Sequence, residues 1–116
     1  MAGGAGLVLT PIPGTEDFWG HFIVQTFIGT IVSAAYPTNG YTVDPATTGQ
    51  LNRFKVIDNA DIAGGTNASG IAWGYDYINK SIRGYQNAAG AGALAELSGT
   101  FPSSGSALLK ITFYGR

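Results

Sequence analysis

The chain of 116 residues has no cysteine and few charged residues, and these shortages limit the kinds of cross-link, metal site and surface that it can have. Without cysteine it has neither disulfide bonds nor thiolate metal sites. Charged residues make up only 11% of the chain, against about 25% in typical domains. Because a free monomer usually covers itself with charge, this shortage favours a surface hidden by partners over a small, neutral surface rich in Thr, Ser and Asn.

The charges that are present form no basic cluster along the sequence and no catalytic motif. The net charge is −1, and the six basic residues are scattered, so we expect no nucleic-acid binding. His21 is the only histidine and lies in an apolar stretch without a nucleophile or carboxylate beside it. One histidine without cysteine does not make a zinc site. We predict a protein that is not an enzyme and uses no metal or cofactor; a hydrolase with a pair of carboxylates in one cleft stays open as an alternative.

Long apolar runs are also absent. The apolar stretch over residues 22–32 is interrupted by polar residues and is too short to span a bilayer as a helix. The first residues lack the basic opening and apolar core of a signal peptide. We therefore expect a protein made in the cytosol, without secretion by a cleaved signal and without membrane association.

What the chain does have is alternation of apolar and polar residues. Large apolar residues recur at every second position in Ile71, Trp73, Tyr75 and Tyr77, the period of a half-buried strand. A reversal at 79–81 and an extended stretch over 82–85 complete a predicted β-hairpin, in which a basic residue such as Lys80, Arg83 or Lys110 would pair with Asp76.

Two further strands alternate clearly. Residues 106–114 place Ala107, Leu109, Ile111 and Phe113 on one face. Residues 18–32 are apolar on both faces, which predicts one long or two consecutive strands covered on both sides. About seven short strands with hardly any helix predict an all-β fold, an antiparallel β-sandwich or barrel.

The remaining segments read as connections. We expect one helical turn over 44–49, a strand over 53–57, a long loop over 59–70, an Ala/Gly loop over 87–93 and a turn over 101–105. Residues 1–17, which are rich in Gly and Pro, are predicted to form either a frayed terminus or an extended N-terminal arm that reaches a neighbour through Leu7, Val8, Leu9 and Ile12. A single β domain over 18–116 follows.

From about Thr30 onward the order of these parts resembles a group of small tailed-bacteriophage virion proteins, usually placed among capsid decoration (cement) proteins. The matching stretches are 36–40, 43–49, 75–80, 88–93, 95–97 and 108–116; the helical turn reads Asp-Pro here instead of Thr-Pro. The resemblance implies a non-enzymatic β protein, made in the host cytoplasm and located in the virion, that binds the major capsid protein on the capsid surface, often as a homotrimer.

A protein that acts in this way would use exposed aromatic and aliphatic side chains at its interfaces. The predicted interface residues are Leu7, Leu9, Ile12, Phe18, Trp19, Phe22, Tyr36 and Tyr41. An alternative is a carbohydrate-binding or receptor-binding β module on the virion, in which Trp73, Tyr75, Tyr77 and Tyr85 form a face that stacks on sugar rings.

Overall fold

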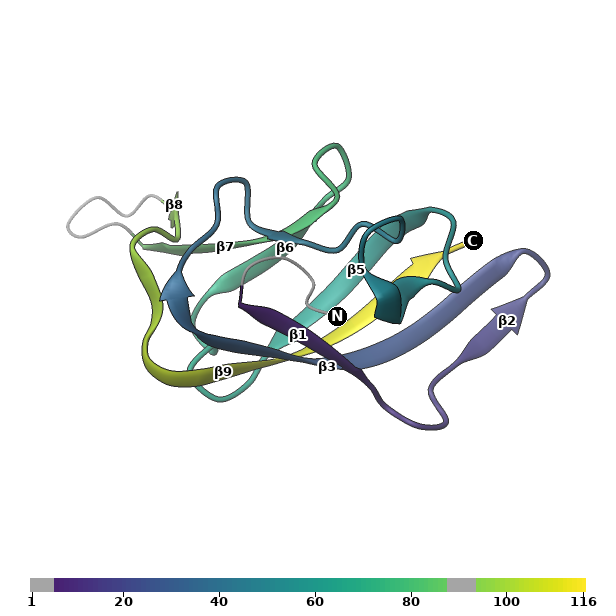
Figure 1. Ribbon diagram of the computed structural model, residues 1–116, viewed down its shortest axis with the longest axis horizontal. Coiled ribbons are helices and arrows are strands. Elements are labelled where there is room, and N and C mark those ends of the chain that lie inside the picture. The colour runs from purple at the N-terminus through teal and green to yellow at the C-terminus, as the bar shows by residue number, and fades with distance from the viewer. Residues whose placement is uncertain (1–5, 88–93) are drawn as a thin grey trace.

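A computed structural model describes residues 6–87 and 94–116, and these residues contain nine β-strands and no α-helix (Figure 1). The strands are β1 (Leu7–Pro11), β2 (Asp17–Trp19), β3 (Phe22–Ala35), β4 (Tyr41–Thr42), β5 (Ile57–Gly64), β6 (Ala72–Asp76), β7 (Ser81–Asn87), β8 (Leu94–Glu96) and β9 (Thr100–Gly115). The predicted all-β class is confirmed, although β3 and β9 are much longer than the short strands expected.

The larger sheet, sheet A, is built around the long antiparallel pair of β3 and β9. β5 pairs with the other edge of β9, while β1 and β2 pair with successive stretches of the other edge of β3. Because β2 pairs only with residues 22–24, the β2–β3 hairpin extends beyond β1 and forms one end of the elongated molecule (Figure 1).

The smaller sheet, sheet B, has β7 at its centre, β6 on one edge, and β4 and β8 on the other. β6 and β7 form the predicted hairpin, in which Trp73 and Tyr75 lie opposite Gly84 and Ile82. Asp76 finds its predicted basic partner in Arg83, whose Nη2 lies 2.9 Å from Asp76 Oδ2.

The two sheets pack face to face as a β-sandwich and enclose one hydrophobic core. Ala107, Leu109, Ile111 and Phe113 of β9 are all buried there, which confirms the alternation read from the sequence. The Phe27 and Phe113 rings meet edge to face, with their centroids 5.5 Å apart. Sheet B contributes a second set of side chains to this core: Tyr41, Ile82, Trp73 and Tyr75.

Three stretches differ from the prediction. The predicted loop over 59–70 begins as β5, because residues 59–64 pair with β9. The predicted turn over 101–105 lies inside β9, as a bulge in which residues 102–105 stand opposite Ser33 alone. The predicted strand over 53–57 is also wrong, since only Ile57 is in a strand, and Phe54 is buried while Val56 is exposed.

The N-terminal segment, where it is described, is part of the sandwich. β1 pairs with β3 from Leu7↔Ile31 to Pro11↔Phe27, and Leu7 and Leu9 are buried in the core. Residues 7–11 are therefore an edge strand of sheet A and not a free arm. Residues 1–5, like the expected Ala/Gly loop over 88–93, lie outside the described residues.

The helical turn expected over 44–49 does form. The Thr48 N–H donates to the Asp44 carbonyl at 2.8 Å, and Asp44 Oδ1 accepts a hydrogen bond from the Ala46 N–H at 3.0 Å. A short 3₁₀ helix, η1 (Gly49–Leu51), follows and buries Leu51.

Candidate functional site

The outer face of sheet A, on the side away from sheet B, carries apolar side chains that no described residue covers. Four of them are 39–55% exposed: Val8, Phe22, Val32 and Leu108. Val8, Thr30 and Leu108 form one row across β1, β3 and β9. In the paired stretches of β1, β3, β5 and β9, this face has only two charged residues, Lys110 and Asp61. A broad sheet face that is so poor in charge is typical of an interaction surface.

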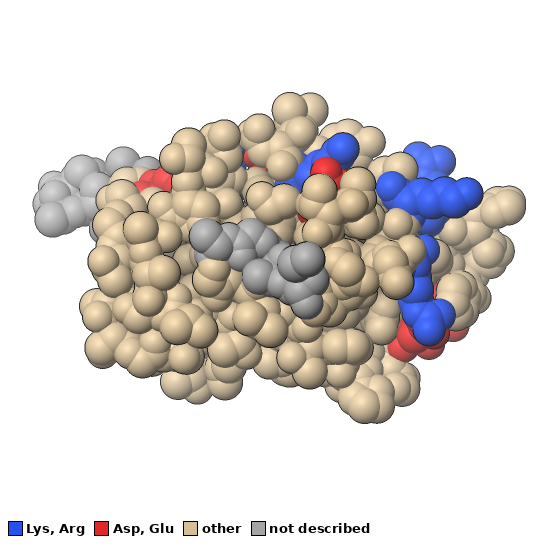
Figure 2. Space-filling model, in the orientation of Figure 1, with Lys and Arg blue, Asp and Glu red and all other residues tan. Residues whose placement is uncertain are grey.

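Charge is distributed unevenly over the molecule. Figure 2 shows one face on which Lys and Arg gather at the end formed by the β2–β3 hairpin, while most of the remaining surface is free of charge. The low charged fraction read from the sequence thus leaves large neutral areas on the folded chain.

The tip of the β2–β3 hairpin, residues 17–23, is here called the aromatic finger. Phe18, Trp19 and Phe22 are 53%, 71% and 55% exposed. Gly20, with φ +62°, begins the two-residue turn between Trp19 and Phe22, which is the glycine position of a type II′ turn. The Trp19 indole N–H donates to Asp17 Oδ2 at 2.8 Å, so the exposed ring is held in one orientation.

The predicted interface residues fall into three groups, which are exposed, buried and half-buried. Phe18, Trp19 and Phe22 are all exposed on the aromatic finger, where Trp19 pairs with Phe22 on one face and Phe18 pairs with Ile23 on the other. Leu7, Leu9 and Tyr41 are corrected: they are buried in the core, because alternation along β1 and β4 turns them toward the other sheet. Ile12 and Tyr36 are half-buried. The prediction missed the outward-facing Val32 and Leu108, although the two-faced pattern of residues 22–32 already indicated Val32; Val8, expected to contact a neighbour as part of the arm, is exposed on the same face.

Tyr36 belongs to a polar cluster on sheet B instead of an open surface. Its hydroxyl donates to Glu96 Oε2 at 2.7 Å and accepts a hydrogen bond from the Gly84 N–H at 3.2 Å. Arg83 lies between Glu96 and Asp76, at 3.2 and 2.9 Å. Burial, together with the hydrogen bond to Glu96, raises the pKa of Tyr36 well above its ordinary value. These contacts join β6, β7 and β8 and explain Tyr36 as a structural residue.

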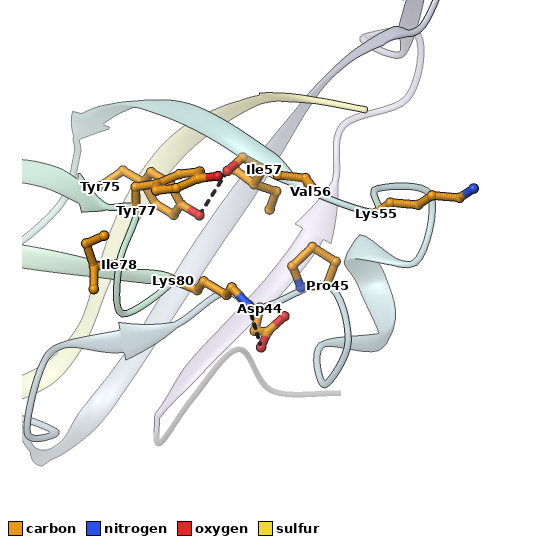
Figure 3. Close-up of a pocket in the computed structure, with 9 residues that line it drawn as sticks. All are labelled: Asp44, Pro45, Lys55, Val56, Ile57, Tyr75, Tyr77, Ile78 and Lys80. Carbon is orange, nitrogen blue, oxygen red and sulfur yellow. Dashed lines mark hydrogen bonds and ion pairs between the residues drawn. The ribbon is translucent and has the colours of Figure 1, made fainter.

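The four aromatic residues predicted to stack on sugars do not form one face. Trp73 and Tyr75 point toward the core, whereas Tyr85 lies on the opposite face of sheet B, paired with Ala72. Tyr75 and Tyr77 do line a pocket of about 300 Å³ (Figure 3). In that view the Tyr75 hydroxyl donates to the Ile57 carbonyl at 3.2 Å, and Lys80 lies across the pocket beside Asp44.

The described residues form no recognisable metal-binding site. They contain no group of three or more His, Asp or Glu side chains placed to hold a metal ion. His21 lies exposed in the turn of the aromatic finger. Over residues 6–87 and 94–116, no helix has the length and apolar character required to cross a membrane.

Comparison with known proteins identifies no relative of this chain. Neither a protein-family model nor any curated protein or solved structure matches this chain significantly. A function is therefore inferred from the chain's own sequence and surfaces.

Proposed function

We propose that this chain is a non-enzymatic structural protein of a bacteriophage virion, a capsid decoration protein that binds across junctions between major capsid protein subunits. The observation that carries the proposal is the outer face of sheet A, where exposed Val8, Val32 and Leu108 lie among threonines with few charges. The resemblance of residues 30–116 to small virion proteins supports the same function.

The mechanism is mechanical. A rigid sheet that contacts two neighbouring shell subunits at once buries apolar area on both, so separating the subunits would expose that area to water. About 25 cal/mol is gained for each Å² of apolar surface buried, and a standard interface buries roughly 1,600 Å². The unbroken pairing of β3 with β9 from Ile23↔Gly115 to Val32↔Ser106 supports this face with a regular ladder of hydrogen bonds, which favours a rigid contact surface.

The proposal is tested by locating the chain on an assembled capsid. Purified chain is mixed with empty capsids assembled from the major capsid protein of the same phage, and the mixture is sedimented and imaged by cryo-electron microscopy. We expect stoichiometric binding, with density at subunit junctions on the outer surface. Failure to cosediment, or density at the tail or inside the head only, would overturn the decoration role.

A second candidate function, a carbohydrate-binding or receptor-binding module on the virion, is favoured by one observation. The pocket lined by Tyr75 and Tyr77 has aromatic walls with a lysine and a carboxylate at its edge, a combination that suits a sugar ring. This candidate is tested by titrating the chain with mono- and oligosaccharides while tyrosine fluorescence is measured. The Tyr77→Ala variant is titrated in the same way as a control. No saturable change in signal would remove this candidate.

A further inference from the structure

The aromatic finger protrudes from the sandwich, and the described residues leave its three aromatic side chains largely uncovered. Phe18, Trp19 and Phe22 are each more than half exposed, yet the hydrogen bond from Trp19 to Asp17 keeps the indole in place. Side chains that are fixed before binding lose little entropy when a partner covers them. Aromatic residues of this kind supply much of the binding energy at protein interfaces.

A hollow of about 600 Å³ lies beside the aromatic finger, which contributes His21 and Ile23 to its lining, and is here called the basic hollow. Its lining consists of His21, Ile23, Arg53, Lys55, Val56 and Arg116. The lining combines two apolar side chains, Ile23 and Val56, with the cationic side chains of Arg53, Lys55 and Arg116. Ile23 is the cross-strand partner of Phe18, so the Phe18 side of the finger and the basic hollow share one face.

The finger and the hollow are complementary in chemistry. The hollow presents guanidinium and ammonium groups, which bind both aromatic faces and carboxylates. The finger presents aromatic rings next to Glu16 and Asp17. Arg53 bonds Glu16 of its own chain at 2.7 Å and Arg116 lies 3.7 Å from Asp58, but Lys55 has no ion pair with any residue in the described ranges. Lys55 is thus free to meet the Asp17 carboxylate of another chain.

Every copy of the chain carries both surfaces, and the two lie at the same end of the molecule. We propose that copies of this chain associate by packing the aromatic finger of one copy into the basic hollow of the next. Contacts of this head-to-tail kind close into a ring when the rotation between copies is a fraction of a full turn. The inference deepens the proposed function by naming the self-association surface, but it makes its own prediction for the chain in the absence of a capsid.

The test is the mass of the purified chain, measured by sedimentation equilibrium without capsids. We expect a multiple of 12.0 kDa for the wild type and 12.0 kDa for Phe18→Ala and Trp19→Ala. The matched control is Tyr77→Ala, because Tyr77 is as exposed as Phe18 but lies at the tip of the other hairpin, and it keeps the wild-type mass. Unchanged far-ultraviolet circular dichroism shows that each variant is folded.

A cross-link identifies the contact itself. The chain has no cysteine, so His21→Cys, which keeps all three aromatic anchors of the finger, and Val56→Cys are made as separate proteins and mixed under mild oxidation. We expect a disulfide between the two variants at least tenfold faster than between His21→Cys and Tyr77→Cys. A monomeric wild type, finger variants that keep the wild-type mass, or equal cross-linking rates would each overturn the inference, even for a chain that binds capsids.

Discussion

At the scale of single residues, Tyr41 has a buried hydroxyl with no hydrogen-bond partner among the described residues. A buried polar group without a partner costs about 1–3 kcal/mol of stability. We therefore expect Tyr41→Phe to leave the free energy of unfolding unchanged or to raise it by up to about 1 kcal/mol, as measured by urea unfolding.

Tyr36→Phe is the matched control, because it removes the same atom from a hydroxyl with two partners. Glu96 loses a donor and the Gly84 N–H loses an acceptor. The free energy of unfolding of this variant should be about 1–3 kcal/mol lower than that of the wild type. If the two substitutions destabilise the protein equally, the hydroxyl of Tyr41 has a partner and the argument from its burial is wrong.

Tyr41 also makes stability depend on alkaline pH. Burial raises the pKa of Tyr41 to about 12, whereas the same tyrosine in the unfolded chain ionises near pH 10. The stabilisation is therefore fully present below pH 10 and is lost between about pH 10 and pH 12 as the unfolded state gives up its proton. For one such tyrosine, the free energy of unfolding falls by up to about 1.4 kcal/mol per pH unit in this range.

Chemical unfolding at a series of pH values measures this effect. Tyr75, whose pKa burial also raises to about 12, adds a second contribution of the same sign. Tyr41→Phe should flatten the fall in stability above pH 10 and leave the Tyr75 contribution in place. An equally steep fall in the variant would show that Tyr41 ionises alike in the folded and unfolded chains.

At the scale of strands, the end of β9 is tightly enclosed. A Cβ at Gly115 would meet the carbonyl oxygen of Val56 and lie 2.9 Å from Phe54 Cδ1, because residues 54–57 pass directly over it. Gly115→Ala should therefore force the two segments apart and cost about 1–3 kcal/mol, measured by thermal or urea unfolding.

Gly74 in β6 is the matched control, since a Cβ there meets no atom within 4 Å. Gly74→Ala should be neutral or stabilise the chain by about 0.4–1 kcal/mol, because alanine restricts the unfolded state. A loss for Gly74→Ala as large as that for Gly115→Ala would show that strand glycines matter here for flexibility and not for close approach.

Strand prediction succeeded where neighbouring residues alternate in the sequence. The hairpin of Trp73, Tyr75 and Ile82 and the last strand with Leu109 and Ile111 were both readable in this way. β5 was missed because residues 59–64 are rich in Ala, Asn and Gly, and only pairing with β9, about 50 positions later in the chain, makes them a strand. Long-range pairing leaves little trace in a local pattern.

The candidate site was predictable to a lesser extent. Phe18, Trp19 and Phe22 were identified as interface residues by type, and they do lie exposed, but the turn at Gly20 that joins them into a finger was not recognised. Leu7 and Leu9 were read as an arm because glycine and proline surround them; the structure instead pairs them with β3. Residue type alone does not tell which apolar side chains the fold will bury.

At the scale of the whole molecule, the proposal assigns two surfaces to two partners, and one substitution separates them. Val32 points outward from sheet A at the last β3–β9 pair before the bulge, opposite Ser106 and far along β3 from the aromatic finger. Val32→Glu places a carboxylate among the exposed apolar side chains of the proposed capsid-binding face. Burying it without a partner costs several kcal/mol, so capsid affinity should fall at least tenfold in cosedimentation, while the mass in solution stays that of the wild type.

Thr42→Glu is the control for this experiment, because it adds the same charge to the exposed outer face of sheet B, where Thr42 lies opposite Ser81. It should bind capsids like the wild type. If Thr42→Glu loses binding and Val32→Glu keeps it, the sandwich meets the shell through sheet B. If Val32→Glu dissociates the free protein, the outer face of sheet A joins copies of the chain to one another, and the aromatic finger does not.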